Sequence, residues 1–271
     1  MGKTLAVAGL QRWREGQGCS ADEDLVASEV PVALTINRQS YVVMMATPMD
    51  LEDFALGFCL TEGLLRDTQE LHAVRVVPRE QGLELALTVA SEVAERLASQ
   101  RRNLTGRTGC GLCGAESLEQ AVRPPQPLSQ NLRIAHAAVQ RALAALSAQQ
   151  PLQAASGAVH CAAWCRPDGG IALAREDVGR HNALDKLIGA LLRAGQDPRT
   201  GFLLVSSRAS YEMVQKSVVA GVELLAAVSA PTSLAIELAR ASGLSLLGFT
   251  RPGRHNIYTG AARLYEEEHS A

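Results

Sequence analysis

The feature that most constrains the fold of this chain is the stretch Pro124-Pro125-Gln126-Pro127 near its middle. Proline lacks a backbone N–H and fixes φ, so three prolines in four residues cannot continue a helix or a central strand. We therefore expect a domain boundary here, between residues 29–123 and residues 128–271, with residues 1–28 as an N-terminal leader. A chain of 271 residues is long enough for one large domain or two modest ones.

The half before this boundary is expected to be a small α+β domain. Residues 30–46 hold two β-rich runs around a turn at 37–39, which predicts a hairpin. A helix is expected next, because Thr47 and Asp50 resemble a capping box and apolar residues follow at helical spacing. Further along, the pattern predicts strands at 73–78 and 83–89 and a short helix at 91–99.

Beyond the prolines, helical and strand-like patterns alternate along the chain. Alternation of this kind is typical of a layered α/β domain. The expected fold class is therefore α/β, with a layered mixed-sheet C-terminal domain and a smaller α+β N-terminal domain. Helices are expected near 132–147, 181–194, 210–222 and 232–241, and strands near 158–164, 170–174, 202–206, 225–228 and 244–249.

Composition narrows the classes of function. A net charge of −2 provides no overall basic field, and aromatic residues make up only 4% of the chain, so a dedicated nucleic-acid binder is disfavoured. The apolar run from Leu5 to Leu10 is far shorter than the ~18 residues of a spanning helix and lacks a clear signal-peptide cleavage pattern. We expect a cytoplasmic protein that binds neither nucleic acid nor membrane, so any anionic ligand needs a local site.

Two of the six cysteines lie in a glycine-rich loop that suits sulfur chemistry. The segment 108–114, TGCGLCG, places Cys110 and Cys113 between glycines, which leave the thiols unhindered. Arginines just upstream, and a helix expected to begin near Ala115, favour the thiolate, the form that attacks sulfur. One thiol can carry a persulfide and the other can resolve it, so Cys110 and Cys113 are the predicted catalytic pair.

The alternative is that this pair forms half of a structural zinc site, with His160, Cys161 and Cys165 as the other half. Cys161 and Cys165 lie in an apolar run in which same-parity positions share a buried face, so core cysteines are favoured and no metal is expected. A zinc deaminase requires H-x-E and P-C-x-x-C. Here no glutamate follows His160 at that spacing and Gly109 precedes Cys110, which excludes deamination.

Three basic junctions between expected elements look like anion sites. The first, 175–182, starts a helix with Arg180, His181 and Asn182, which suits a phosphate or a carboxylate. The alternative is that His181 pairs with Asp185 one turn on and merely caps the helix, and both interpretations stay open.

The second junction, 205–210, has more hydroxyls than one helix cap requires, and with Ser207 and Arg208 it favours anion binding. A serine hydrolase is disfavoured because the G-x-S-x-G motif is absent. The third junction places two arginines around a Pro-Gly turn, which suits a phosphate or a guanine-bearing group. Its residues are Phe249, Thr250, Arg251, Pro252, Gly253 and Arg254.

Together these segments resemble a known family. The resemblance extends from about Glu29 to Tyr258 and so covers most of the chain. It is to the formate dehydrogenase accessory sulfurtransferase family, FdhD. The motifs that carry it are TGCGLCG at 108–114, EDVGRHNALDKLIG at 176–189, VSSRASYEMVQKSVV at 205–219 and GFTRPGR at 248–254.

The resemblance implies a function that the residues alone could not name. It implies a sulfurtransferase that takes persulfide sulfur from a cysteine desulfurase and delivers it to the bis-molybdopterin guanine dinucleotide molybdenum cofactor, for maturation of the formate dehydrogenase apoenzyme. Cys110 matches the persulfide-bearing cysteine, and 249–254 matches the cofactor-binding segment, which Ser207, Arg208 and His181 are expected to assist. A cytidine-deaminase-like C-terminal core and a homodimer are also implied.

Two other functions compete with this one. A zinc-stabilised chaperone would bind the molybdenum cofactor without transferring sulfur. The family pattern His-Ala-Ala-Ala reads His160-Cys161-Ala162-Ala163 in this chain, and this departure at Cys161 further weakens the zinc hypothesis. A plain guanine-nucleotide-binding module is disfavoured because no G-x-x-x-x-G-K-[ST] loop occurs.

Overall fold

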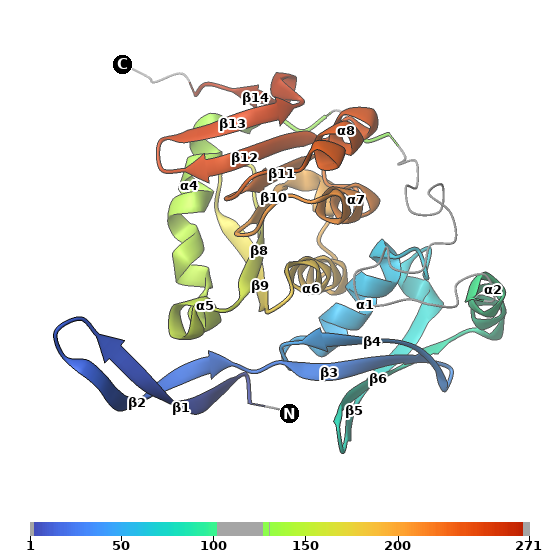
Figure 1. Ribbon diagram of the computed structural model, residues 1–271. Helices are drawn as coiled ribbons and strands as arrows, with labels where there is room; N and C mark the ends of the chain where they lie inside the picture. The colour runs from blue at the N-terminus through green and yellow to red at the C-terminus, as the bar shows by residue number, and fades with distance from the viewer. Residues whose placement is uncertain (1–2, 102–126, 130, 268–271) are drawn as a thin grey trace.

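A computed structural model of the protein describes residues 3–101, 127–129 and 131–267 (Figure 1). In the N-terminal part, its elements are β1 (Leu5–Arg14), β2 (Gly18–Ala27), β3 (Val30–Ile36), β4 (Gln39–Ala46), α1 (Leu51–Thr61), β5 (Leu71–Arg79), β6 (Gly82–Val89) and α2 (Ser91–Arg101). The C-terminal part comprises β7 (Ile134–Ala135), α4 (His136–Leu146), α5 (Pro151–Ser156), β8 (His160–Cys165), β9 (Ile171–Asp177), α6 (Arg180–Arg193), β10 (Phe202–Val205), α7 (Tyr211–Val219), β11 (Leu224–Ala227), α8 (Ser233–Ser242), β12 (Ser245–Arg251), β13 (Arg254–Thr259) and β14 (Leu264–Tyr265).

The N-terminal part contains a four-stranded sheet in the order β4-β3-β6-β5, packed against α1. The hairpin predicted over 30–46 is confirmed, because β3 and β4 pair antiparallel. Asn37 and Arg38 form its turn with positive φ angles of 46° and 69°. The Asn37 side chain also exchanges two hydrogen bonds with the backbone of Val89, 2.9 and 3.0 Å long, which ties the turn to the end of β6.

The capping box expected at Thr47 and Asp50 is wrong. Asp50 is the N-cap of α1, but it has a left-handed backbone (φ 53°) and its side chain makes no capping hydrogen bond. The Thr47 hydroxyl instead accepts a hydrogen bond from the backbone N–H of Val178, and the Thr47 N–H donates to Asp177. A residue that resembled a local cap therefore joins two segments that are far apart in the sequence.

Residues 1–28, expected to form a leader, hold a long hairpin in the structure. Strands β1 and β2 pair antiparallel along their whole lengths, and Figure 1 shows them extending past α5. One face of this arm carries Val7, Trp13 and Leu25, and the Trp13 side chain is 67% exposed. The arm therefore contributes no buried residue to the main hydrophobic clusters.

The C-terminal part is built on a six-stranded sheet in the order β13-β12-β11-β10-β8-β9, and its mixed, layered character confirms the prediction. Strands β10, β11 and β12 are parallel, whereas β8 runs against both β9 and β10. Alternate residues face opposite layers: Ala162 and Trp164 pack with α6, α7 and α8, while Cys161 and Cys165 pack with α4. None of the helices in the described ranges is long and apolar enough to span a lipid bilayer.

The two parts are joined where α1 crosses α6. Gly57 on α1 and Gly189 on α6 allow the backbones into contact: a Cβ built on Gly57 would lie 1.8 Å from the Asp185 carbonyl oxygen, and one on Gly189 would lie 1.9 Å from that of Asp53. Figure 1 shows these helices side by side. The predicted boundary at 124–127 lies mostly outside the described residues, so the division into separate domains stays a prediction.

Buried ion pairs accompany this crossing. Lys186 lies 2.7 Å from the Asp177 carboxylate and also donates to the Thr47 carbonyl oxygen. Both charged groups are fully buried, and burial lowers the pKa of Lys186 while Asp177 opposes that shift. Lys216 on α7 similarly contacts Asp185 and the Thr61 hydroxyl on α1. Each buried charge at the interface therefore has a partner, as a low-dielectric site requires.

Replacing Gly189 with alanine should push α1 and α6 apart. Overpacking of this severity, against backbone rather than a movable side chain, is expected to destabilise the fold by about 3 kcal/mol or more. Gly9→Ala is the control, because a Cβ there meets no atom within 4 Å. Urea unfolding followed by circular dichroism measures both, and equal midpoints for the two variants would refute the close crossing.

Lys186→Met should destabilise the protein by about 3–5 kcal/mol, because it leaves the Asp177 carboxylate buried and without its cation. Methionine fills a similar volume, so the loss of stability reflects the missing positive charge rather than poorer packing. The double variant Lys186→Met/Asp177→Asn should recover part of this loss. Chemical unfolding of the wild type, Lys186→Met, Asp177→Asn and the double variant measures the coupling. A Lys186→Met variant as stable as the wild type would contradict the buried pair.

Candidate functional site

The topology of the C-terminal sheet gathers the predicted junctions at one edge. Because β9, β10, β11 and β12 run in the same direction, their carboxyl ends lie at the same edge. Arg180 follows β9, Arg208 follows β10, and Arg251 ends β12. We call this the basic edge. Ligands of open α/β sheets commonly bind at such an edge.

Backbone hydrogen bonds fix the loops of the basic edge to one another. The Ser206 N–H donates to the Cys161 carbonyl, and the Ser229 N–H donates to the Ser207 carbonyl. The Phe249 N–H then donates to the Ser229 carbonyl, at 3.0 Å. The structure therefore brings the Ser207 and Phe249 junctions together through Ser229, which was not predicted from the sequence.

The turn at 249–254 connects β12 to β13 as a hairpin. Phe249 adopts a left-handed backbone (φ 50°) and is 43% exposed, both uncommon for a bulky aromatic residue. Thr250 is fully buried, and its hydroxyl has no hydrogen-bond partner among the described residues. Backbone strain and an orphaned polar atom in one turn are typical of functional sites.

The two arginines of this turn have different surroundings. Arg251 donates to the carbonyl oxygens of Val228 and Thr250, so it holds the hairpin against the end of β11. Arg254 is exposed, and Pro252 and Gly253 beside it are also exposed. The Gly253 N–H donates to the Gln140 side chain on α4, which anchors the tip of the turn. Arg254 is therefore the arginine of this turn best placed to meet a ligand.

His181 and the serine junction also lie together. The His181 Nε2 atom is 2.7 Å from a carboxylate oxygen of Glu212 and 3.5 Å from the Ser210 hydroxyl. The alternative pairing of His181 with Asp185 is wrong, because Asp185 turns toward Lys216 and Thr61. Glu212 was not predicted as a site residue, although its position in the first turn of α7 could have suggested a role.

The basic edge gathers four guanidinium groups that have no carboxylate partner among the described residues. Arg175 and Arg193 pair with Asp53, and Arg263 pairs with Glu223. No ion pair involves the arginines of the basic edge, which are Arg180, Arg208, Arg251 and Arg254. Their charge is left for an anionic ligand, and the residues fit a phosphate-bearing group.

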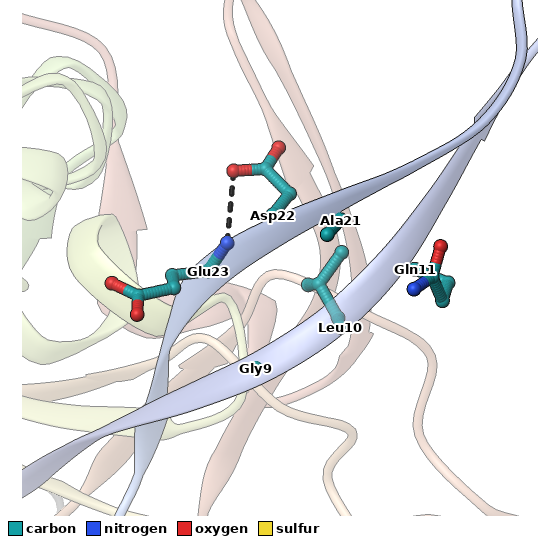
Figure 2. A pocket seen from close by; sticks show the side chains of 6 residues that line it. All are labelled: Gly9, Leu10, Gln11, Ala21, Asp22 and Glu23. Carbon is teal, nitrogen blue, oxygen red and sulfur yellow. Dashed lines mark hydrogen bonds between the residues drawn. The ribbon is translucent and has the colours of Figure 1, made fainter.

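A hollow on the β1–β2 arm is a poor alternative site (Figure 2). It contains two carboxylates and no basic side chain, and Asp22 accepts a hydrogen bond from the Glu23 N–H. It therefore does not suit an anion. The residues that line it are Gly9, Leu10, Gln11, Ala21, Asp22 and Glu23.

The predicted catalytic thiols, Cys110 and Cys113, lie outside the described residues. Four other thiols lie among the described residues: Cys19 on the arm is exposed, whereas Cys59 in α1 and Cys161 and Cys165 in β8 are buried. The three buried thiols differ in reactivity from an exposed one. Burial raises the pKa of all three, in Cys161 to about 12. This confirms the interpretation of these residues as core cysteines, and it disfavours the thiolate form that zinc binds.

Comparisons with known proteins show the family of this chain. The family model described as the FdhD/NarQ family matches residues 27–265, most of the chain. The chain belongs to the FdhD/NarQ family. Among FdhD relatives, a sulfur carrier protein FdhD from Cupriavidus necator is 50% identical over 97% of this chain and 91% of its own length. One from Variovorax paradoxus is 53% identical over 90% of this chain and 87% of its own length.

A solved structure shares the fold of this FdhD/NarQ chain. It is a protein from Desulfotalea psychrophila that is described as a formate dehydrogenase accessory protein. The two structures superpose with a TM-score of 0.76 at 23% sequence identity, covering 97% of this chain and 100% of the other. Likeness at this level of identity supports the fold alone.

The buried thiols should not react with alkylating reagents in the native protein. At about pH 8 we expect iodoacetamide to modify the exposed Cys19 and to spare Cys59, Cys161 and Cys165, because a buried thiol with a raised pKa is both unreachable and protonated. Peptide mass spectrometry before and after denaturation measures this. Rapid native labelling of Cys161 would contradict its position in the core.

Proposed function

We propose that this chain is a sulfur carrier that takes persulfide sulfur from a cysteine desulfurase and delivers it to a molybdenum cofactor for formate dehydrogenase. The relatives named as sulfur carrier protein FdhD support the role in sulfur transfer. Within the structure, the observation that carries the proposal is the group of arginines without carboxylate partners at the basic edge. Such a group suits a cargo with several phosphates, such as the bis-molybdopterin guanine dinucleotide form of the cofactor.

The proposed sulfur acceptor is Cys110. Its thiolate attacks the outer sulfur of the desulfurase persulfide, the S–S bond breaks, and the desulfurase cysteine leaves as a thiolate. In a later step, the Cys113 thiolate attacks the inner sulfur of Cys110, which releases hydrosulfide and leaves a disulfide between the two cysteines. A cellular dithiol then reduces this disulfide. Among the described thiols, Cys59, Cys161 and Cys165 are buried and therefore unsuited to this role, and the exposed Cys19 has no second thiol within a few residues in the sequence to resolve a persulfide.

The proposed cargo site is the basic edge. The exposed ring of Phe249 can stack on a guanine, and Arg254 can form paired hydrogen bonds to a phosphate. Arg208 is exposed next to the buried Ser207, in the loop tied to Phe249 through Ser229. Arg251 is assigned to hold the turn, and Thr250, Pro252 and Gly253 complete it. The bound cargo supplies the acceptor for sulfur, while this chain binds and orients it.

The proposal also includes the cytidine-deaminase-like core and the homodimer, which rest on the family resemblance. It places the protein in the cytoplasm, which rests on the short apolar run at Leu5 to Leu10 and the lack of a clear signal-peptide cleavage pattern. The competing chaperone function would need a zinc site that uses Cys161 and Cys165, and their burial in β8 does not favour it.

Cys110→Ser should abolish formate dehydrogenase activity in cells that depend on this protein, because serine cannot carry a persulfide. Cys19→Ser is the matched control, since Cys19 is exposed but lies on the arm. Circular dichroism should show that both variants fold. Formate dehydrogenase activity that survives in Cys110→Ser cells would refute the mechanism.

Arg254→Ala should weaken GDP binding about tenfold to a hundredfold, which is the loss expected for one charge-assisted hydrogen bond to phosphate. Arg14→Ala, an exposed arginine on the arm, should leave GDP affinity unchanged. Isothermal titration calorimetry measures both variants. Sulfur loading on Cys110 should persist in Arg254→Ala, because accepting sulfur and docking the cargo are separate steps. An unchanged GDP affinity would place the guanine elsewhere.

A further inference from the structure

The tip of the 249–254 turn is held by side chains that lie outside it. Gln140 on α4 accepts a hydrogen bond from the Gly253 N–H, 2.9 Å long. Its amide nitrogen lies 3.2 Å from the Nδ1 atom of His255, the residue that follows Arg254 in β13. The turn that carries Arg254 therefore has a support on α4, and that support includes His255.

A second imidazole continues this set of contacts. His136, the first residue of α4, places its Nδ1 atom 2.9 Å from the Nε2 atom of His255. The two ring planes are inclined by 23°, and their centroids are 5.0 Å apart. His136 and Gln140 are one helical turn apart, so both lie on the same face of α4. His255 is thus hydrogen-bonded through both of its ring nitrogens.

The directions of these hydrogen bonds define where the ring protons lie. The Gln140 carbonyl oxygen accepts from Gly253, so the Gln140 amide nitrogen donates to Nδ1 of His255. A neutral His255 then carries its proton on Nε2 and donates to Nδ1 of His136. Assigned in this way, every contact has one donor and one acceptor, and both imidazoles are neutral.

A proton added to either imidazole breaks this chain of hydrogen bonds. A proton on Nδ1 of His255 would face the amide donor of Gln140, and one on Nδ1 of His136 would face the N–H of His255. A change of tautomer restores the contact with His255 only if the Gln140 amide turns over, and the hydrogen bond from Gly253 is then lost. The support of the turn is therefore linked to the protonation of the histidine pair.

The surroundings of the pair disfavour its protonation near neutral pH. Burial lowers the pKa of His255, and His136 lowers it further, whereas Glu266 opposes the shift. An imidazole with a lowered pKa is neutral at and above the ordinary value of about 6.5, so the chain of hydrogen bonds is intact there. As the pH falls below that value, His255 takes up a proton and the turn loses its support.

The other charged groups around the pair are either exposed or engaged elsewhere. Arg254 and Glu266 are exposed, so solvent screens their charges. Arg141 on α4 pairs with a carboxylate that follows β14, and Arg133, just before β7, lies over an aromatic ring of β14. Arg251, at the end of β12, donates to backbone carbonyl oxygens. The charge state of the pair therefore depends chiefly on its burial and on the effect of each ring on the other.

We propose that Gln140, His136 and His255 are positioning residues for the 249–254 turn, and that acidification releases the turn and weakens its hold on the guanine end of the cargo. The inference rests on the proposed function and deepens it by adding a regulation to the same site. The three side chains do not need to touch the cargo. They act through Gly253 and Arg254, whose backbone groups Gln140 contacts.

The pH dependence of GDP binding tests this inference. From about pH 7.5 to about pH 5.5, calorimetry on the full-length protein should show that the wild type loses roughly threefold to tenfold more affinity than His255→Gln, the effect of one neutral hydrogen bond. The glutamine keeps a donor and an acceptor but takes up no proton. GDP gains a proton on its terminal phosphate in this range, and that loss of affinity is common to both proteins. His72→Gln, at an exposed position on β5, is the matched control and should follow the wild type.

Gln140→Ala separates positioning of the turn from a role in stability alone. The variant should bind GDP roughly threefold to tenfold more weakly at about pH 7.5, and its pH profile should match that of His255→Gln. Urea unfolding measures its stability in parallel. A variant that is less stable but keeps the GDP affinity and the pH profile of the wild type would show that Gln140 only stabilises the fold, and would overturn its assignment.

Nuclear magnetic resonance gives a readout that needs neither a variant nor GDP. On acidification, the Gly253 amide signal should shift with the same midpoint as the His255 ring signals, because the hydrogen bond to Gln140 is lost as the proton is taken up. A Gly253 signal that does not follow this titration, or equal pH profiles in the wild type and His255→Gln, would overturn the inference. A coupled titration in a protein that binds no GDP would instead refute the cargo site of the proposed function and leave the link between the histidine pair and the turn standing.

Discussion

The buried carboxylate of Asp177 is the interaction on which the arrangement of this protein depends. One oxygen accepts hydrogen bonds from the Gly179 N–H and the Asn182 side chain, and the other accepts from the Thr47 N–H and contacts Lys186. Thr47 belongs to the N-terminal part, whereas Gly179 is the N-cap of α6 and Asn182 and Lys186 lie in its first two turns. A single charge thus fixes the beginning of α6 and joins the two parts, and the glycine contact between α1 and α6 continues that junction.

The charged residues of this junction and the arginines of the basic edge lie in different surroundings, and only the first need carboxylate partners. Inside the interface, the buried Lys186 and Lys216 are matched by carboxylates, because unpaired charges there would be strongly destabilising. Arg175 and Arg193, which are partly exposed, pair with Asp53. At the strand ends, solvent and exposed loops tolerate unpaired guanidinium groups. One set of ion pairs therefore compensates the charges buried between the two parts, and the arginines of the basic edge remain for binding an anion.

The elements with strong periodicity were predictable from the sequence, and the exceptions have physical causes. The hairpin at 30–46 and the helices α6, α7 and α8 follow directly from turn residues and apolar spacing. The β1–β2 arm was missed because it has no core on either face to impose alternation. Thr47 was misassigned because a local cap and a distant contact use the same hydroxyl.

The sequence predicted the individual segments of the candidate site, but not the contacts between them. The sequence indicated His181, Ser207, Arg208 and the 249–254 turn, since each combines charge or hydroxyls with an element end. The roles of Ser229 and Glu212 depend on which loops become neighbours, and that follows from sheet order alone. Likewise, the sequence suggested two equivalent arginines in the turn, and only the contacts with Val228 separate Arg251 from Arg254.

The central claim is that this protein carries sulfur on Cys110, and the intact mass of the protein tests it most directly. After incubation with a cysteine desulfurase and free cysteine, the chain should gain the mass of a sulfur atom, and a peptide map should locate it on Cys110. A thiol reductant should remove the added mass. A wild-type protein that gains no sulfur under these conditions would contradict this claim. A Cys110→Ser variant that gains as much sulfur as the wild type would contradict it as well.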